Sequence, residues 1–281
     1  MDQQPLRNIL KAGASRIDAA MQADLASVES PLLKEILHHA IFQGGKRIRP
    51  LLVCSSATLL GRPSADLDTL AIAFEYLHAA SLLHDDVIDH ADLRRGKETA
   101  NRRWGNATVI LAGDYLLARA MELVAAAGGV ECQRLVSEAL RHMVEGEFLQ
   151  MRVAETQDTS EAGYFAILQG KTAALIAAAC EVGIIFAGGS MAQRQALRTY
   201  GANLGLAFQI IDDLLDYQGD PKETGKAVGN DFQEGKMTLP LLIACNTAGE
   251  TGRARLRTLL AATPEARQEA FPEAQHLLIE S

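Results

Sequence analysis

The sequence predicts an all-α protein built from long packed helices. Apolar residues recur with helical spacing almost throughout, and alternating strand patterns and Asn-Gly hairpins are missing. Residues that favour helices, namely Ala, Leu, Glu and Gln, are dense in seven segments: 31–42, 64–90, 106–127, 131–154, 161–187, 191–218 and 237–247.

Short glycine-containing breaks separate these segments. None is long enough for a flexible interdomain linker, and no fixed-period repeat is visible. We therefore expect a single domain spanning residues 1–281. The breaks are QGGK (43–46), GRPS (61–64), AAGGV (126–130), AGGS (187–190) and QGDPKETGKAVGND (218–231).

Composition excludes several classes of protein. With 48% hydrophobic residues the chain buries a substantial core and is not disordered. The net charge of −8 argues against a nucleic-acid binder, so any bound anion must meet local basic clusters. The four cysteines lie far apart without a CxxC pair, as expected of buried thiols in a reducing cytosol.

No membrane segment or secretory signal is expected. The N-terminal stretch MDQQPLRNIL has no apolar core of the kind that signal peptides carry. Residues 172–189 reach the length of a membrane span, but Glu181 interrupts them and Ala and Gly are frequent. We expect a packed interior helix there, and a cytoplasmic protein.

Two similar aspartate clusters interrupt apolar helices. A single acidic cluster is more often a solvated helix face, but the flanks in SLLHDDVIDHADLRRG (81–96) and FQIIDDLLDYQGD (208–220) are too apolar for that. The clusters consist of Asp85, Asp86 and Asp89, and of Asp212, Asp213 and Asp216.

Helical spacing puts each cluster on a stripe that would normally face a core, which indicates a central cavity. If the two stripes face each other, six carboxylates converge, and divalent cations must neutralise them. Only oxygen ligands are offered, so Mg²⁺ is the expected ion and a diphosphate or triphosphate its expected co-ligand. The stripes are Glu75, His78, Leu82, Asp85 and Asp89, and Gly205, Gln209, Asp212 and Asp216.

Two basic runs complete the predicted phosphate site. QGGKRIRP (43–50) places Lys46, Arg47 and Arg49 between two glycines and the start of a helix, where an anion is favoured. A basic turn alone is more often a solvated corner. LRRGKE (93–98), however, follows the first aspartate cluster and must lie at the rim of the same cavity. Without a Walker A or GxGxxG motif, a diphosphate with a hydrocarbon tail fits better than a nucleotide.

The chain resembles the trans-type (all-E) isoprenyl diphosphate synthases, or polyprenyl synthetases, from about residue 30 to about 245. The motifs occur in the family order: GGKRIRP, LLHDDVIDHADLRRG, GDYLLARA, GEFLQ, GKTAALI, FQIIDDLLDY and GKAVGNDFQEGKMTLPLL. The resemblance implies the isoprenoid synthase fold.

The resemblance also implies roles for individual residues. It makes Asp85 and Asp89 the first-cluster Mg²⁺ ligands with Asp86 in support, and Asp212 the principal second-cluster ligand with Asp213 and Asp216 behind it. Arg94 would grip the allylic diphosphate. Lys46, Arg49, His78 and Arg95 would bind isopentenyl diphosphate, and Lys171, Thr172, Gln209, Lys226 and Lys236 would contact the allylic substrate. The residues expected to be catalytic are Asp85, Asp89, Arg94, Lys171, Asp212 and Lys226.

The implied reaction needs no nucleophilic side chain. Three Mg²⁺, for which Mn²⁺ can substitute, assist departure of the allylic diphosphate. Oxygens of Lys171, Thr172 and Gln209 steady the cation. Isopentenyl diphosphate then adds head-to-tail and a proton leaves. Geranyl, farnesyl and geranylgeranyl diphosphate are the candidate primers. The family is typically homodimeric, and 106–127 is apolar on more than one face.

Product length is predicted from the residues one turn before Asp85. Ala80 and Ser81 are small, which leaves the tunnel open, unless Tyr76 forms its floor. We expect a medium- or long-chain product beyond geranylgeranyl, near octaprenyl. A farnesyl or geranylgeranyl diphosphate synthase is the alternative.

Two other classes of protein fit less well. A terpene cyclase normally lacks the second DDxxD and the GGKR pocket, and a non-catalytic synthase subunit usually has one eroded cluster. One departure from the family pattern lies near the C-terminus, where members usually continue through further helices. This sequence has no Lys or Arg after Arg267.

Overall fold

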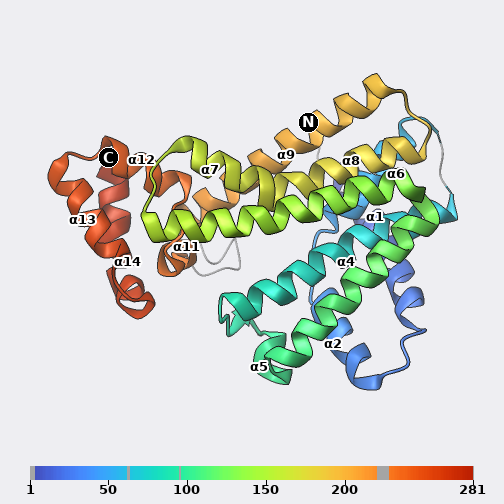
Figure 1. The fold of residues 1–281 in the computed structure, drawn as a ribbon, viewed down its shortest axis with the longest axis horizontal. Coiled ribbons are helices and arrows are strands. Elements are labelled where there is room, and N and C mark those ends of the chain that lie inside the picture. Colours follow the sequence, from blue (N-terminus) through green and yellow to red (C-terminus); the bar gives the residue numbers. More distant parts are fainter. Residues whose placement is uncertain (1–3, 62–63, 95, 220–227, 281) are drawn as a thin grey trace. The chain divides into compact units, whose positions relative to one another are not determined.

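The computed structural model describes residues 4–61, 64–94, 96–219 and 228–280, almost all of them helical (Figure 1). The all-α prediction is confirmed. The first half contains α1 (Gln4–Leu25), α2 (Pro31–Phe42), α3 (Ile48–Thr58), α4 (Ala65–Ile88), α5 (Ala100–Trp104) and α6 (Asn106–Thr156). The second half contains α7 (Glu161–Leu168), the π-helical turn η1 (Gln169–Ala173), α8 (Ala174–Phe186), α9 (Met191–Gln218), α11 (Asn230–Glu234), α12 (Leu239–Thr247), α13 (Glu250–Leu260) and α14 (Pro264–Glu280).

Helix boundaries agree with the sequence pattern where apolar spacing is strong. The bounds of α2 and α9 are those predicted. The predicted segments 106–127 and 131–154 both lie in α6, whose two helical parts meet at a kink where Gly129 has non-helical backbone angles (φ 71°, ψ −174°). The predicted break AAGGV (126–130) falls at this kink. The predicted segment 161–187 divides into α7, η1 and α8.

Several elements lie outside the predicted segments. Helices α1, α13 and α14 have more polar compositions than the predicted segments, so the density of apolar residues did not reveal them. The described residues also contain one short antiparallel ladder, β1 (Leu93–Arg94) with β2 (Lys97–Glu98), although no strand was expected. Its brevity explains why no alternating pattern marks it.

The described chain groups into two compact units. Unit 1 comprises residues 1–139 and 175–201, and unit 2 comprises 140–174 and 202–281. All three boundaries fall inside helices, in α6, α8 and α9, and not in flexible linkers. That arrangement agrees with the absence of linker sequences, and the single domain over residues 1–281 stays a prediction.

In unit 1 the core surrounds α4. Leu70, Phe74 and Leu77 are fully buried there, because this helix is packed on several sides. Helix α8 belongs to the same core, and nine of its residues between Leu175 and Ile184 are buried.

The core of unit 2 gathers around α11 and α12. Tyr217, Phe232, Leu241, Leu256 and Ala274 are buried together, and they come from α9, α11, α12, α13 and α14. The end of α9, which carries the second aspartate cluster, is therefore held by packing of its Tyr217.

One helical stretch among the described residues, Glu161–Phe186, is long and apolar enough to cross a membrane. Of its most apolar window, 56% is buried inside the protein. The carboxylate of Glu181 lies 3.5 Å from the Arg198 guanidinium of α9. Both findings agree with the predicted interior helix.

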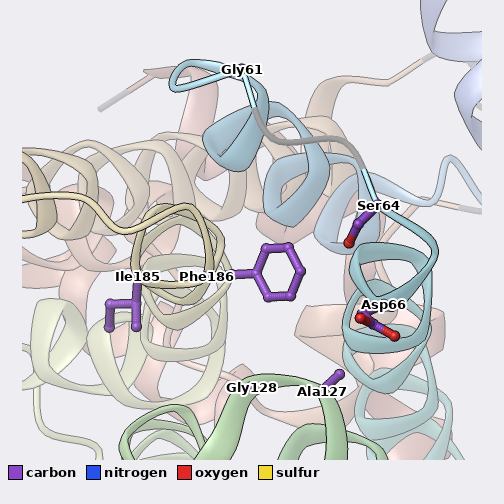
Figure 2. A pocket seen from close by; sticks show the side chains of 7 residues that line it. All are labelled: Gly61, Ser64, Asp66, Ala127, Gly128, Ile185 and Phe186. Atoms are coloured by element: carbon purple, nitrogen blue, oxygen red, sulfur yellow. The ribbon is translucent and has the colours of Figure 1, made fainter.

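Unit 1 has a pocket of about 560 Å³ at the start of α4. Figure 2 shows the Phe186 ring of α8 pointing toward Ser64 and Asp66. No residue predicted to bind substrate lines this pocket. The lining residues are Gly61, Ser64, Asp66, Ala127, Gly128, Ile185 and Phe186.

Candidate active site

The first aspartate cluster lies on the last turn of α4 and just after it. Asp86 is buried, and its Oδ1 accepts a 2.8 Å hydrogen bond from Arg94 Nε of β1. Burial raises the pKa of Asp86, and the nearby Arg94 charge opposes that rise. Asp85 is half-buried, and Asp89 is exposed at the C-cap of α4. Asp86 therefore anchors Arg94, while its two neighbours lie nearer to solvent.

A small cavity of about 40 Å³ adjoins this ion pair within unit 1. Residues of α2, α4 and the β1–β2 segment line it, so the basic run 93–98 lies beside the first cluster as predicted. The lining residues are His39, Ala40, Gln43, Ala79, Leu82, Leu83, Asp86, Arg94, Glu98, Thr99 and Ala100.

The GGKR turn divides its basic residues between core and surface. Gly44 and Gly45 adopt φ angles of 102° and 145°, which side chains disfavour. Arg47 is buried and donates 2.7 Å hydrogen bonds to Asp18 and Glu75. The expectation that Arg47 belongs to the anion-binding turn is therefore wrong. Its charge is neutralised inside the protein by two carboxylates.

Arg49 offers a positive group of a different kind. In the described part of the chain, its buried Nε has no hydrogen-bond partner. Burial lowers the pKa of Arg49, with Glu75 partly opposing this. A buried guanidinium N–H without an acceptor is unfavourable unless a ligand supplies one, so Arg49 suits an anion. Lys46 is exposed and His78 is half-buried.

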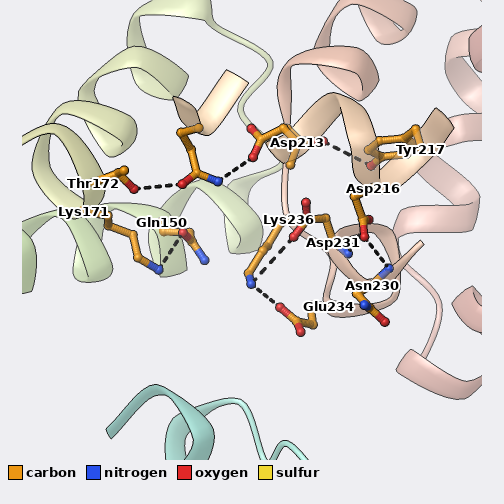
Figure 3. Close-up of polar contacts among 12 residues, drawn as sticks. Gln150, Lys171, Thr172, Asp213, Asp216, Tyr217, Asn230, Asp231, Glu234 and Lys236 are labelled. Atoms are coloured by element: carbon orange, nitrogen blue, oxygen red, sulfur yellow. Dashed lines mark hydrogen bonds and ion pairs between the residues drawn. The ribbon is translucent and has the colours of Figure 1, made fainter. Parts of the chain in front are cut away.

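The second aspartate cluster is organised around Asp213 (Figure 3). The buried Asp213 carboxylate accepts 2.8 Å hydrogen bonds from the Tyr164 hydroxyl and from Gln209 Nε2. Thr172 Oγ1 donates to Gln209 Oε1 over 2.9 Å, which fixes the orientation of this amide. Burial raises the pKa of Asp213, and the bonds from Gln209 and Tyr164 lower it.

Asp216 holds the start of α11. Its carboxylate accepts the backbone N–H groups of Asn230 at 3.3 Å and Asp231 at 2.9 Å (Figure 3). This satisfies amides that a helix start leaves unpaired. Lys236 follows α11, and its ammonium pairs with Glu234 and with Asp231. Asp212, which directly precedes Asp213 in α9, is half-buried.

Lys171 lies in η1, where α6 crosses very closely. Its ammonium contacts Glu147 at 2.5 Å and Gln150 at 2.9 Å. A Cβ added at Gly146 would lie 2.9 Å from the backbone nitrogen of Lys171, and one added at Gly170 would lie 2.8 Å from the carbonyl oxygen of His142. The two glycines therefore permit the close approach, and the π-helical turn is of the kind found at functional sites.

The carboxylates fit a hard metal ion that a phosphate would help to hold. Within the ranges described, no three His, Cys, Asp or Glu side chains form a ready-made metal site. The carboxylates of Asp86, Asp213 and Asp216 accept the hydrogen bonds from protein groups described above. The half-buried or exposed Asp85, Asp89 and Asp212 offer oxygen donors of the type that Mg²⁺ and Ca²⁺ bind.

Comparison with known proteins identifies the family. The polyprenyl synthetase family model matches residues 30–278. The chain belongs to the polyprenyl synthetase family. It is 44% identical over 214 residues to an octaprenyl diphosphate synthase of Haemophilus influenzae, a match that covers 76% of this chain and 65% of that protein, less than two thirds of its length. It is 37% identical over 260 residues to the Escherichia coli octaprenyl diphosphate synthase, covering 92% and 80%.

Solved structures show the same fold. A Caulobacter crescentus polyprenyl synthase, complexed with calcium and isoprenyl diphosphate, superposes with a TM-score of 0.89 at 38% identity, over 99% of this chain and 84% of that one. The predicted isoprenoid synthase fold is confirmed. The family and its named relatives also confirm the predicted class of enzyme, a trans-prenyltransferase. A short chain isoprenyl diphosphate synthase of Methanothermobacter thermautotrophicus is 39% identical over 265 residues, 92% of this chain and 81% of that protein.

In this polyprenyl synthetase, two predicted substrate-binding residues, Arg95 and Lys226, lie outside the described residues. Three side chains that organise the site were not predicted as site residues. Tyr164 anchors Asp213, and Glu147 and Gln150 hold Lys171. Glu147 and Gln150 both lie in the GEFLQ motif, but nothing in the sequence pairs Tyr164 with an acid 49 residues later.

The predicted chain-length residues lie on two different sides of α4. Ser81 is half-buried one turn before Asp85, and its hydroxyl donates to the His78 carbonyl. Ala80 is fully buried, as is Tyr76, whose hydroxyl donates to Asp24 Oδ2 at 3.0 Å. The Tyr76 hydroxyl is thereby directed toward α1, on the same face of α4 as Ala80.

Proposed function

We propose that this chain elongates an allylic diphosphate by head-to-tail condensation with isopentenyl diphosphate, releasing diphosphate. The supporting observation is the common construction of the two DDxxD clusters. In each, the middle acid is buried and fixed by protein donors, Asp86 by Arg94 and Asp213 by Tyr164 and Gln209. Such fixed supports are what a metal–diphosphate site requires.

Mg²⁺, three ions in each site, is the proposed cofactor, and Mn²⁺ can substitute. Asp85, Asp89 and Asp212 would hold the ions, with Asp86, Asp213 and Asp216 in support. Bound there, the ions supply charge neutralisation for the departing diphosphate. Cations are needed there because the aspartate carboxylates and the diphosphate are both negatively charged and repel each other.

The chain's own cations and dipoles complete the proposed chemistry. On the allylic side, Lys171 is held by Glu147 and Gln150, so its position is fixed before substrate arrives. Oxygens of Lys171, Thr172 and Gln209 stabilise the developing allylic cation without attacking it. The allylic diphosphate is bound by Arg94, Lys171, Lys226 and Lys236, and the isopentenyl diphosphate by Lys46, Arg49, His78 and Arg95.

The proposed product is a medium- or long-chain polyprenyl diphosphate, near octaprenyl, made from geranyl, farnesyl or geranylgeranyl diphosphate. The small side chain of Ser81 supports this, because it leaves room one turn below Asp85. The direction of the Tyr76 hydroxyl toward Asp24 also argues against Tyr76 as the tunnel floor. A short-chain synthase, making farnesyl or geranylgeranyl diphosphate, is the alternative.

We further propose a cytoplasmic homodimer. On α6, Val144, Phe148 and Met151 follow helical spacing and are 58%, 68% and 45% exposed. An exposed apolar stripe of this kind on a long helix suits contact with a second copy.

The proposal is tested by supplying each primer separately with labelled isopentenyl diphosphate, with Mg²⁺ or with a chelator. We expect incorporation only with a divalent ion, and none with isopentenyl diphosphate alone. A cyclised hydrocarbon from the primer alone would support a terpene cyclase instead. Inactivity that a second, different chain restores would support the subunit alternative.

A further inference from the structure

One face of α14 contacts the segment that carries Lys236. Arg267, Phe271 and Gln275 are spaced four residues apart, so they project from the same side of this helix. All three contact either the end of α9, which carries the second aspartate cluster, or the segment around α11, which follows it in the chain.

Arg267 completes the end of α11. The Lys236 N–H donates to the Asp231 carbonyl at 2.8 Å, the Gly235 N–H donates to the Phe232 carbonyl at 3.0 Å, and Gly235 has a φ of 77°. This is a Schellman ending, which leaves the Gln233 carbonyl outside its two bonds. Arg267 Nε donates to that carbonyl at 2.8 Å, and its Nη1 donates to Leu260 at the end of α13 over 3.0 Å.

The guanidinium also packs against the turn before Lys236. A Cβ added at Gly235 would lie 2.6 Å from Arg267 Nη1. The backbone that leads into Lys236 is therefore fixed both by a hydrogen bond and by direct contact.

The start of α11 is held from the same face. A Cβ added at Gly229 would lie 2.8 Å from the Phe271 ring, and Gly229 directly precedes the amides that bind Asp216. Gln275 Nε2 donates to the Tyr217 carbonyl at 2.6 Å, one residue after Asp216. Both ends of α11 and the end of α9 thus depend on α14.

We propose that Arg267 is a positioning residue for the allylic diphosphate site. It fixes the turn from which Lys236 extends, so that the ammonium is in place before the diphosphate binds. The inference rests on the proposed function, because Lys236 matters only if an allylic diphosphate is the substrate. Without Arg267, the five-residue α11 loses its C-terminal support, and Lys236 must be ordered at the time of binding.

The test compares Arg267→Ala and Arg267→Lys with a matched control, Arg255→Ala. Arg255 is an exposed arginine of α13 that pairs with Glu273 of α14. Its replacement therefore removes an arginine contact between α14 and a neighbouring helix without removing Arg267. We expect Arg267→Ala to raise the KM for farnesyl diphosphate about tenfold, equivalent to about 1.4 kcal/mol, with the KM for isopentenyl diphosphate changed less than twofold. Arg267→Lys, which can serve one carbonyl, should give an intermediate value, and Arg255→Ala the wild-type values.

Two measurements do not need turnover. Hydrogen exchange of peptides covering residues 228–238 should be faster in Arg267→Ala and unchanged in Arg255→Ala. Binding of a non-reactive thiolo analogue of farnesyl diphosphate with Mg²⁺ should weaken about tenfold.

Equal increases in both KM values would overturn the proposal, as would unchanged exchange at 228–238 or identical behaviour of the Arg267 and Arg255 variants. If Arg267→Ala does not fold, Arg267→Lys carries the same comparison. A wild-type protein that elongates no primer would contradict the proposed function. The hydrogen-exchange and analogue-binding measurements would still test whether Arg267 positions Lys236, because neither needs turnover.

Discussion

At the scale of single residues, the account rests on Asp85 and Asp212, the half-buried first acids of the two aspartate clusters. Replacing either by Asn should lower turnover on the order of 100-fold or more, because Asn lacks the negative charge proposed to hold the metal ions. Steady-state elongation assays measure this. Asp66→Asn, at the opposite end of α4 from Asp85, is the control and should keep wild-type turnover.

Tyr164 gives a second prediction at this scale. Tyr164→Phe removes the hydroxyl that donates to the buried Asp213 carboxylate, so we expect a loss of roughly 1.5–3 kcal/mol in the free energy of unfolding. Urea unfolding measures it, with the exposed Tyr200→Phe as control. If the two variants are equally stable, Tyr164 does not anchor the cluster.

Glu181 links stability to pH. Burial raises its pKa above the ordinary value, with Arg198 opposing and Glu138 reinforcing the shift. The folded protein therefore holds this proton more tightly than the unfolded chain, and the free energy of unfolding falls as pH rises from the unfolded pKa through the folded pKa. Glu181→Gln should lessen that fall, as measured by unfolding at several pH values. A larger fall in the variant would show that the Arg198 interaction dominates.

At the scale of elements, the crossing of α6 and η1 depends on two glycines. Gly170→Ala places a methyl group 2.8 Å from the His142 carbonyl, so we expect a destabilisation of roughly 1–3 kcal/mol and displacement of Lys171 with a loss of activity. Gly249→Ala is the control, since its added Cβ meets nothing within 4 Å. Thermal unfolding and elongation assays together test this, and a Gly170→Ala enzyme with normal activity would contradict it.

The elements also show what the sequence could and could not predict. The strongly periodic α2 and α9 have the expected bounds, because a continuous apolar stripe fixes a helix without tertiary information. The polar α14 was missed, since its structure depends on contacts with α11 that no local pattern encodes. In the same way the two aspartate clusters were found from spacing, whereas the pairing of Asp213 with Tyr164 and the burial of Arg47 against Glu75 required the fold.

At the scale of the whole molecule, we expect a homodimer. Sedimentation velocity at micromolar concentration should show twice the mass of the 30.2 kDa chain. Phe148→Glu should shift the protein toward monomer, because it places a charge in the exposed apolar stripe of α6. Leu6→Glu, an equally drastic change at an exposed position of α1, should not. A monomeric wild-type protein would contradict this prediction.

The central claim, that the chain elongates an allylic diphosphate, is tested most directly by sizing its products. The protein is incubated with Mg²⁺, labelled isopentenyl diphosphate and farnesyl diphosphate, and the labelled chains are dephosphorylated and separated by length. The account predicts Mg²⁺-dependent products longer than geranylgeranyl, clustered near octaprenyl, and shortened by Ser81→Tyr, which places a ring one turn before Asp85. Products that stop at farnesyl or geranylgeranyl length would contradict the predicted chain length, and no incorporation of isopentenyl diphosphate with any primer would contradict the claim itself.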